Sequence, residues 1–246
     1  MSKESLCTES SGNSPFSVSH PVYSFIKRAA DVVLSVALLL LLSPLLLLVC
    51  CVIKLTSCGP VIFKQRRVGK NSRSFTVYKF RTMLVTAPKN VATQDLCDPD
   101  SHLTCVGKLL RRTSIDELPQ IFNVLLGDMS FIGPRPLILA ETKMHKMREE
   151  FGVYTVRPGM TGLAQINGRD NVTDEQKLEF DCRYLRKFGL WQDLYILVKS
   201  LRVVLSRKDI AEGTTEEDSS SPLIEALSEP VSPPVSPPVF ERKKVG

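Results

Sequence analysis

The chain has 246 residues, of which 43% are hydrophobic, and a formal net charge of +6. This length accommodates one sizeable domain with appendages. Arginines are spread through the middle of the chain, which favours anionic partners such as phosphates, nucleotides or an anionic membrane face. Because no groove-reading module is recognisable, the sequence argues against a nucleic-acid partner.

Cysteine and histidine usage narrows the class further. The seven cysteines form no CxxC pair and have no regular spacing, which is typical of reduced thiols in a cytosolic setting. The three histidines are isolated and give no zinc pattern. A metal site in this protein must therefore be built from carboxylates.

The N-terminal third contains a candidate membrane segment. Residues 1–24 are predicted to be a disordered, polar segment, and an apolar run over residues 32–53 follows. One helix of that length would cross a bilayer. However, Ser43-Pro44 divides the run, and a proline inside a helix kinks or breaks it. Basic residues flank both ends, and positive charge marks the cytoplasmic side. A spanning anchor remains open, but these features favour a re-entrant helix–break–helix hairpin over residues 25–55.

A catalytic domain is predicted over residues 56–212. Short β-prone runs at 61–63 and 75–78, separated by a turn-like cluster at 69–72, predict a small β-hairpin. Its basic side chains are either solvated or in contact with lipid headgroups or a phosphate substrate. They are Lys64, Arg66, Arg67, Lys79 and Arg81.

The most informative stretch is residues 113–120, which contains the adjacent acids Asp116 and Glu117. Apolar residues recur at helical spacing over 118–126, so the acids are predicted to open an amphipathic helix. Adjacent helical side chains diverge by about 100°. The two acids therefore suit different tasks around one anionic group, namely attack on phosphorus and coordination of a hard cation such as Mg²⁺. Ser114-x-x-Glu117 also fits a capping box, in which the acids only stabilise a helix start.

Two later segments offer phosphate contacts. In Gly133-Pro134-Arg135-Pro136 the prolines hold the Arg135 guanidinium on a stiff, non-helical strut, and such a group binds oxyanions well. Between Arg157 and Arg169, three glycines and a proline suit a loop around a nucleotide or diphosphate. A purely structural strut and ordinary turns explain the same patterns.

Residues 174–208 predict one or two helices with a broad apolar stripe, which fits a helix on a membrane surface or one packed on the core. Residues 213–246 are rich in Glu, Ser and Pro and predict a disordered tail. The predicted fold class is α+β and mostly helical. It combines the re-entrant membrane hairpin, a small β-hairpin and amphipathic interfacial helices around a cytosolic active site.

An ordered series of motifs resembles a known family. The motifs are Lys27-Arg28-x-x-Asp31, Ser43-Pro44, Phe63-Lys64-Gln65-x-Arg67-Val68-Gly69, Tyr78-Lys79-Phe80-Arg81-Thr82-Met83, Asp116-Glu117-Leu118-Pro119-Gln120, Asn123-Val124-Leu125-x-Gly127-Asp128-Met129-Ser130, Gly133-Pro134-Arg135-Pro136 and Arg157-Pro158-Gly159-x-Thr161-Gly162-Leu163-Ala164-Gln165. Over residues 25 to about 210 the chain resembles the bacterial sugar transferases, or monotopic phosphoglycosyl transferases. These enzymes pass a phospho-sugar from a nucleotide diphospho-sugar to a polyprenyl phosphate. With only a short polar segment before the hairpin, the chain is similar to the minimal catalytic form.

The resemblance implies roles for individual residues. Asp116 would be the nucleophile that forms a covalent phospho-sugar aspartate and releases UMP, and Glu117 would coordinate Mg²⁺. Asp181 falls where the family carries an acid near the site. The implied phosphate and nucleotide contacts are Arg81, Arg111, Arg135, Arg157, Gly159 and Arg169.

The resemblance also implies partners and location. A UDP-sugar donor, a polyprenyl (undecaprenyl) phosphate acceptor and membrane lipids are expected, and a homodimer and downstream glycosyltransferases are further candidates. The reaction would be the first membrane step of surface glycan synthesis, on the cytoplasmic face of the bacterial inner membrane. The alternative is a catalytically silent, membrane-anchored protein that binds polyprenyl phosphate or assists assembly. The sequence does not specify the sugar, which could be an N-acetylated or deoxygenated hexose, glucose or galactose.

Overall fold

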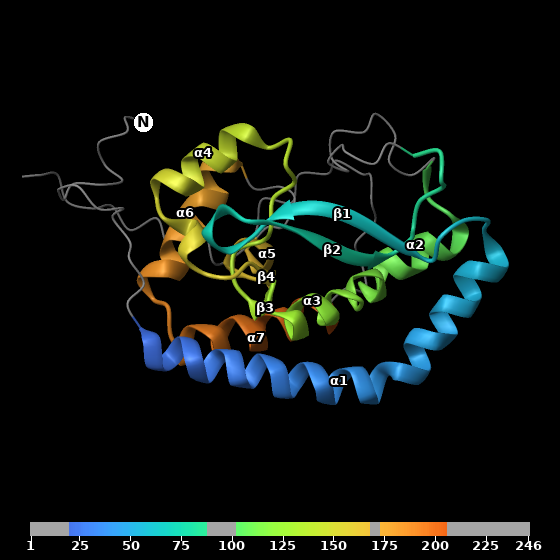
Figure 1. Cartoon of the computed structure of the whole chain (residues 1–246), viewed down its shortest axis with the longest axis horizontal. Helices are drawn as coiled ribbons and strands as arrows, with labels where there is room; N and C mark the ends of the chain where they lie inside the picture. Colours follow the sequence, from blue (N-terminus) through green and yellow to red (C-terminus); the bar gives the residue numbers. More distant parts are fainter. Residues whose placement is uncertain (1–19, 88–101, 168–172, 206–246) are drawn as a thin grey trace, which may run out of the picture. The chain divides into compact units, whose positions relative to one another are not determined.

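The computed structural model describes residues 20–87, 102–167 and 173–205. The described elements, with η marking single-turn 3₁₀ helices, are α1 (Pro21–Thr56), β1 (Ile62–Val68), η2 (Lys70–Ser72), β2 (Ser74–Phe80), α2 (Cys105–Arg112), η5 (Ile115–Glu117), α3 (Gln120–Leu126), β3 (Ser130–Ile132), α4 (Thr142–Glu150), η6 (Val153–Thr155), β4 (Gly159–Thr161), α5 (Leu163–Ile166), α6 (Asp174–Arg186) and α7 (Leu190–Leu205) (Figure 1). The predicted α+β, mostly helical class is confirmed. The predicted tail, residues 213–246, lies outside the described residues.

One long helix, α1, occupies the apolar segment. Pro44 lies inside this helix and deprives the carbonyl of Leu40 of its usual N–H donor. The hydroxyl of Ser43 donates to that carbonyl at 2.8 Å and so replaces the missing bond. The expected break therefore takes the form of a bend in one continuous helix, and Figure 1 shows the helix axis turning in its C-terminal half.

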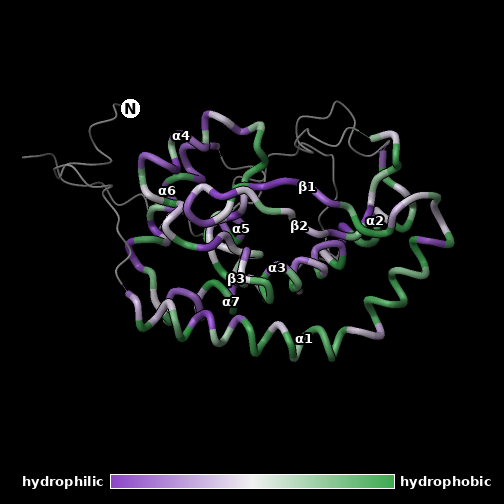
Figure 2. The backbone as a smooth tube through the Cα atoms, viewed as in Figure 1, coloured by the Kyte–Doolittle hydropathy of each residue, from purple (hydrophilic) through white to green (hydrophobic). Residues whose placement is uncertain are grey.

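Most of α1 is apolar and exposed. Figure 2 shows hydrophobic residues along most of the helix, with hydrophilic ones near its start. The helix is long and apolar enough to cross a membrane, and only 11% of its most apolar 18-residue window is buried. A core helix of a soluble protein would bury far more of such a surface.

Charged residues near the start of α1 attach it to the rest of the chain. Lys27 forms an ion pair with Asp193 of α7. Arg28 donates to the carbonyls of Val124 (2.6 Å) and Leu125 (2.8 Å) at the end of α3. A cation beside the last carbonyls of a helix is favoured by the helix dipole. These basic residues, expected from the sequence as membrane-flanking charge, therefore also dock α1.

The predicted β-hairpin is confirmed. Strands β1 and β2 pair antiparallel, with Gln65 opposite Val77 and Phe63 opposite Lys79. Because strand side chains alternate between faces, Arg67 of β1 shares one face with Val77 and Lys79 of β2. A second sheet, the short parallel pair β3–β4, was not predicted; it joins the strut region to the glycine-rich segment.

Among the described residues, apolar side chains pack in three clusters that hold these elements together. One cluster joins the C-terminal half of α1 to the hairpin and α2, through Val49, Ile53, Phe80 and Leu110. Another lies between β2 and α3, through Val77, Val124 and Met129. The largest includes residues of β3, α4, α6 and α7, among them Ile132, Met144, Leu178, Cys182, Tyr184 and Ile196.

Residues 174–208, predicted as one or two helices, contain the two helices α6 and α7. Helix α7 has two different faces: Ile196 is fully buried, whereas Trp191 is 82% exposed. It therefore packs on the core through one face and leaves apolar side chains on the other.

Candidate active site

The acidic pair lies in a turn of its own, η5, between α2 and α3. Helix α3 begins only at Gln120, after Pro119. The prediction that the acids open this helix is therefore wrong, because a proline cannot donate the hydrogen bond that would join the two segments. Ser114 has a left-handed backbone (φ 57°) and makes no capping hydrogen bond, so the capping-box explanation of Glu117 does not apply.

A pocket opens beside this turn. It is lined by Arg67, Val77, Lys79, Glu117, Gln120, Arg135, Pro136 and Gly159. Three of the lining side chains are cationic and one is anionic, a composition suited to an oxyanion of a substrate. Asp116 is not among the lining residues; it directly precedes Glu117 and is only 7% exposed.

Two cations hold Glu117. Its Oε1 lies 2.7 Å from Lys79 Nζ and 3.5 Å from Arg135 Nη2. Burial alone would raise the pKa of Glu117, but Lys79, Arg135 and Arg67 outweigh burial and lower the pKa to about 2. Glu117 is therefore a carboxylate throughout the physiological pH range.

Asp116 has the opposite electrostatic balance. Burial raises its pKa to about 6, and Glu117 adds to the rise, whereas Lys79, Arg111 and Arg135 oppose it. Two neighbouring carboxylates whose pKa values are pushed apart suit different chemical roles. This difference fits the division into nucleophile and cation ligand, which stays a prediction.

The backbone that presents Arg135 is held on both sides. The carbonyl of Pro134 accepts from the N–H of Gly159 at 2.9 Å, and the carbonyl of Pro136 accepts from Arg67 Nη1 at 2.6 Å. The Arg135 side chain is 43% exposed and reaches the acidic turn from this support. The stiff strut expected from the two prolines is thus reinforced by hydrogen bonds from two other elements.

The glycine-rich segment packs closely against the strut. A Cβ on Gly159 would lie 2.1 Å from the nitrogen of Gly133, and one on Gly162 would lie 2.2 Å from the oxygen of Gly133. The N–H of Gly159 donates to Pro134, so it is not a free donor for a diphosphate as the loop interpretation expected. Gly159 nevertheless borders the pocket.

We expect Gly159→Ala to lower the melting temperature, because its methyl group fits only if β3 and β4 separate. The cost is on the order of 2–4 kcal/mol. Thermal unfolding followed by intrinsic fluorescence measures it. Gly189→Ala is the matched control, since a Cβ there would lie 3.8 Å from the carbonyl oxygen of Lys187, an ordinary van der Waals distance. Equal melting temperatures for the two variants would contradict the packing role.

Two of the expected phosphate-binding arginines make structural contacts. Arg81 is buried and donates to the carbonyl (2.9 Å) and the hydroxyl (2.5 Å) of Ser57, just beyond α1. Arg157 donates through Nε to the carbonyl of Gly127 at 2.9 Å, at the end of α3. Neither residue lines the pocket.

The three remaining predicted site residues, Arg111, Asp181 and Arg169, differ in their relation to the pocket. Arg111, in the last turn of α2, is near enough to oppose the rise in the pKa of Asp116. Asp181 forms an ion pair with Arg148 at 2.6 Å and does not line the pocket. Arg169 lies outside the described residues.

Comparison with known proteins identifies the family. The profile described as "Bacterial sugar transferase" matches residues 22–207. The chain belongs to the bacterial sugar transferase family. The family resemblance read from the sequence motifs is therefore confirmed.

Two of three curated relatives of this chain have named activities. A UDP-N-acetylgalactosamine-undecaprenyl-phosphate N-acetylgalactosaminephosphotransferase of Aeromonas hydrophila is 44% identical over 191 residues, which cover 76% of this chain and 45% of the relative. A UDP-glucose:undecaprenyl-phosphate glucose-1-phosphate transferase of Escherichia coli is 44% identical over 183 residues, 72% of this chain and 39% of the relative. An uncharacterized sugar transferase, EpsL, of Bacillus subtilis is 38% identical over 187 residues, 76% of this chain and 91% of the relative. The chain spans less than half the length of the first two.

Three polar residues that line the pocket, Arg67, Lys79 and Gln120, were not among the predicted site residues, although Arg67 and Lys79 had been considered as contacts to lipid headgroups or a phosphate substrate. Arg67 and Lys79 were grouped with the other basic residues of the hairpin. The available signal was the two-residue alternation of a strand, which separates Arg67 from Arg66 and places it on the face that carries Lys79.

The carboxylates near the pocket could hold the expected Mg²⁺ only if phosphate oxygens of a substrate supplied further ligands. Across the part of the chain that the structure describes, no group of three or more His, Cys, Asp or Glu side chains could hold a metal ion. Both ion pairs of Glu117 use the same oxygen, Oε1. Mg²⁺ is commonly bound by one or two carboxylates together with phosphate oxygens and water. Magnesium binding stays a prediction.

Proposed function

We propose that this chain transfers a sugar 1-phosphate from a UDP-sugar to a polyprenyl phosphate and releases UMP. The reaction would begin the assembly of a surface glycan. Two relatives are named as transferases of this kind that act on undecaprenyl phosphate. The observation that carries the proposal is the buried Asp116, whose pKa is about 6, next to Glu117 and the cationic pocket.

The proposed chemistry has two displacement steps. A carboxylate oxygen of Asp116 attacks the phosphorus that bears the sugar, the P–O bond to the α-phosphate breaks, and UMP leaves with the bonding electron pair. Asp116 then carries the phospho-sugar as an acyl phosphate. A phosphate oxygen of the polyprenyl phosphate attacks the same phosphorus, the bond to Asp116 breaks, and the carboxylate is restored.

The pocket supplies charge for both steps. Arg67, Lys79 and Arg135 would bind the oxygens of the diphosphate and stabilise the negative charge that develops on them. Glu117 would hold Mg²⁺ together with diphosphate oxygens and water. Bound Mg²⁺ supplies charge neutralisation at the diphosphate.

We also propose that the chain lies in the cytoplasmic membrane with α1 as a re-entrant helix and the pocket on the cytosolic side. Supporting this, several described helices expose large apolar side chains, including Leu40 of α1 (72%), Leu126 of α3 (68%) and Trp191 of α7 (82%). Such surfaces are favoured in a bilayer or at its interface. The bend at Pro44 and the basic residues at both ends of α1 fit entry and exit on one side.

Pro44→Ala should convert the re-entrant helix into a spanning one. An alanine at position 44 restores the backbone N–H that can donate to the Leu40 carbonyl, and so removes the cause of the bend. The N-terminus would then move to the other face. A single cysteine, Pro15→Cys in a chain without the native cysteines, is labelled from either side of sealed vesicles. Pro60→Ala, just after α1, is the matched control and should leave the N-terminus cytoplasmic. An unchanged labelling side in Pro44→Ala would refute the role of the proline.

Mass spectrometry of the lipid product tests the proposed function. Membranes that contain the full chain are supplied with undecaprenyl phosphate and, separately, UDP-N-acetylgalactosamine, UDP-glucose or UDP-galactose. We expect one donor to yield undecaprenyl diphospho-sugar and an equal amount of UMP. No lipid-linked sugar with any of these or other UDP-sugars would contradict the proposal.

A further inference from the structure

Three successive carbonyls of the Arg135 strut each accept a hydrogen bond from a different element. Pro134 accepts from Gly159 of β4, and Pro136 accepts from Arg67 of β1, as described above. The middle carbonyl, that of Arg135 itself, accepts from Nη1 of Arg148 on α4 at 2.7 Å. Since two of these three residues are prolines and donate nothing, their carbonyls are the groups by which the backbone can be held.

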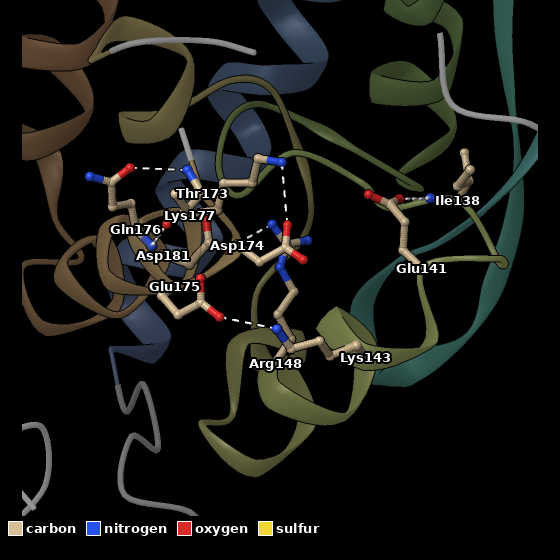
Figure 3. A network of polar contacts seen from close by, with 10 residues as sticks. All are labelled: Ile138, Glu141, Lys143, Arg148, Thr173, Asp174, Glu175, Gln176, Lys177 and Asp181. Carbon is tan, nitrogen blue, oxygen red and sulfur yellow. Dashed lines mark hydrogen bonds and ion pairs between the residues drawn. The ribbon is translucent and has the colours of Figure 1, made fainter. Parts of the chain in front are cut away.

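Arg148 is in turn held by an ion pair with Asp181. Its Nη2 lies 2.6 Å from Oδ2 of Asp181 on α6, and both side chains are almost fully buried (4% and 3% exposed). Figure 3 shows these residues within the polar network between α4 and α6. A guanidinium is a planar fork, so one arginine can bind the carboxylate and the Arg135 carbonyl at the same time. A lysine in the same place would offer a single point of contact.

We infer that Arg148, anchored by Asp181, is a positioning residue that sets the backbone of Arg135 so that its guanidinium stays beside Glu117. The inference rests on the proposed function, in which Arg135 contacts the diphosphate. The Arg135 side chain is 43% exposed and its Nη2 lies 3.5 Å from Glu117 Oε1. The side chain extends from this backbone, so a shift of the Arg135 backbone would move the guanidinium relative to Glu117.

A buried ion pair can also serve the fold alone, and replacing one partner is then destabilising wherever the pair is. The two roles differ in how they depend on Arg135. A positioning role acts through Arg135 and disappears once that side chain is removed, whereas a purely structural role does not. A double-mutant cycle therefore separates them.

The experiment measures kcat and KM for UMP release by the full chain in membranes, for the single variants Arg148→Lys and Arg135→Gln and for the double variant. We expect Arg148→Lys alone to lower kcat about 10–30-fold, with KM for the UDP-sugar changed less than about 3-fold. In the Arg135→Gln background the same change should lower kcat less than about 3-fold. If Arg148→Lys does not fold, Asp181→Asn, which keeps the shape of the side chain, takes its place in the cycle.

Lys143→Met is the matched control. Lys143 joins the same two helices by an exposed ion pair with Glu175 at 3.1 Å and should leave kcat unchanged. Equal losses from Arg148→Lys in the two backgrounds would overturn the inference while the proposed function stands. A wild-type chain that releases no more UMP than Asp116→Asn would overturn the proposed function and the inference with it.

Discussion

Asp116→Asn should reduce UMP release to background, at least about 10³-fold below the wild-type chain, because an amide oxygen cannot act as the nucleophile or form the acyl phosphate. Membrane fractions supplied with UDP-sugar and polyprenyl phosphate measure this loss. The result also separates the enzyme from the alternative of a silent polyprenyl-phosphate-binding protein. Such a protein would show no UMP release that depends on Asp116.

The same variant should be more stable than the wild-type chain. Burial raises the pKa of Asp116 from the ordinary 3.8 to about 6, so the folded state binds the proton more tightly than the unfolded chain. Below the lower value the carboxyl is protonated in both states; above the higher value its buried charge costs up to about 3 kcal/mol. Asn carries no charge at any pH. We therefore expect a melting temperature a few degrees higher at pH 7.5.

The pH dependence provides the check. The difference in melting temperature between Asp116→Asn and the wild-type chain should shrink as the pH falls from 7.5 to 4, measured in EDTA without substrate. Asp174→Asn is the matched control: Asp174 lies in the first turn of α6, where the helix dipole favours its charge. It should keep UMP release and gain no stability. A less stable Asp116→Asn at pH 7.5 would contradict the burial of this charge.

Elements with local signals were predictable. The β-hairpin followed from two β-prone runs around a turn-like cluster, and the bend in α1 followed from Pro44. The acidic pair stood out because two carboxylates next to basic residues suit phosphoryl chemistry. In each of these cases the cause lies within a few residues of the chain, which is the range over which a single sequence is informative.

What could not be predicted depends on residues far apart in the chain. Strands β3 and β4 have only three residues each, and their pairing is evident only when Gly133 and Gly159 are brought together. Arg28 could be read as membrane-flanking charge, but not as the donor to the end of α3, almost 100 residues later. Arg81 looked like a phosphate ligand because nothing local distinguishes a substrate contact from one to Ser57.

Glu117→Gln should lower the stability of the fold, whereas Asp116→Asn should raise it. Although burial opposes ionisation, the surrounding cations lower the pKa of Glu117 from 4.5 to about 2. The charge therefore stabilises the fold above pH 4.5, and this stabilisation is lost as the pH falls towards 2. It amounts to at most about 3 kcal/mol, reduced by solvent because the side chain is 24% exposed. We expect a lower melting temperature at pH 7.5 and a loss of UMP release of about 10²–10³-fold.

Removal of the opposing cation tests the cause. If Glu117 stabilises the fold by compensating Lys79, then the double variant Glu117→Gln/Lys79→Met should recover much of the melting temperature lost in Glu117→Gln, since no uncompensated charge remains between them. Glu175→Gln, which breaks an exposed ion pair, is the matched control and should leave the melting temperature unchanged. Opposite shifts from two adjacent acids are expected only if one is buried against its charge and the other is paired. A Glu117→Gln chain as stable as Asp116→Asn would contradict that electrostatic arrangement.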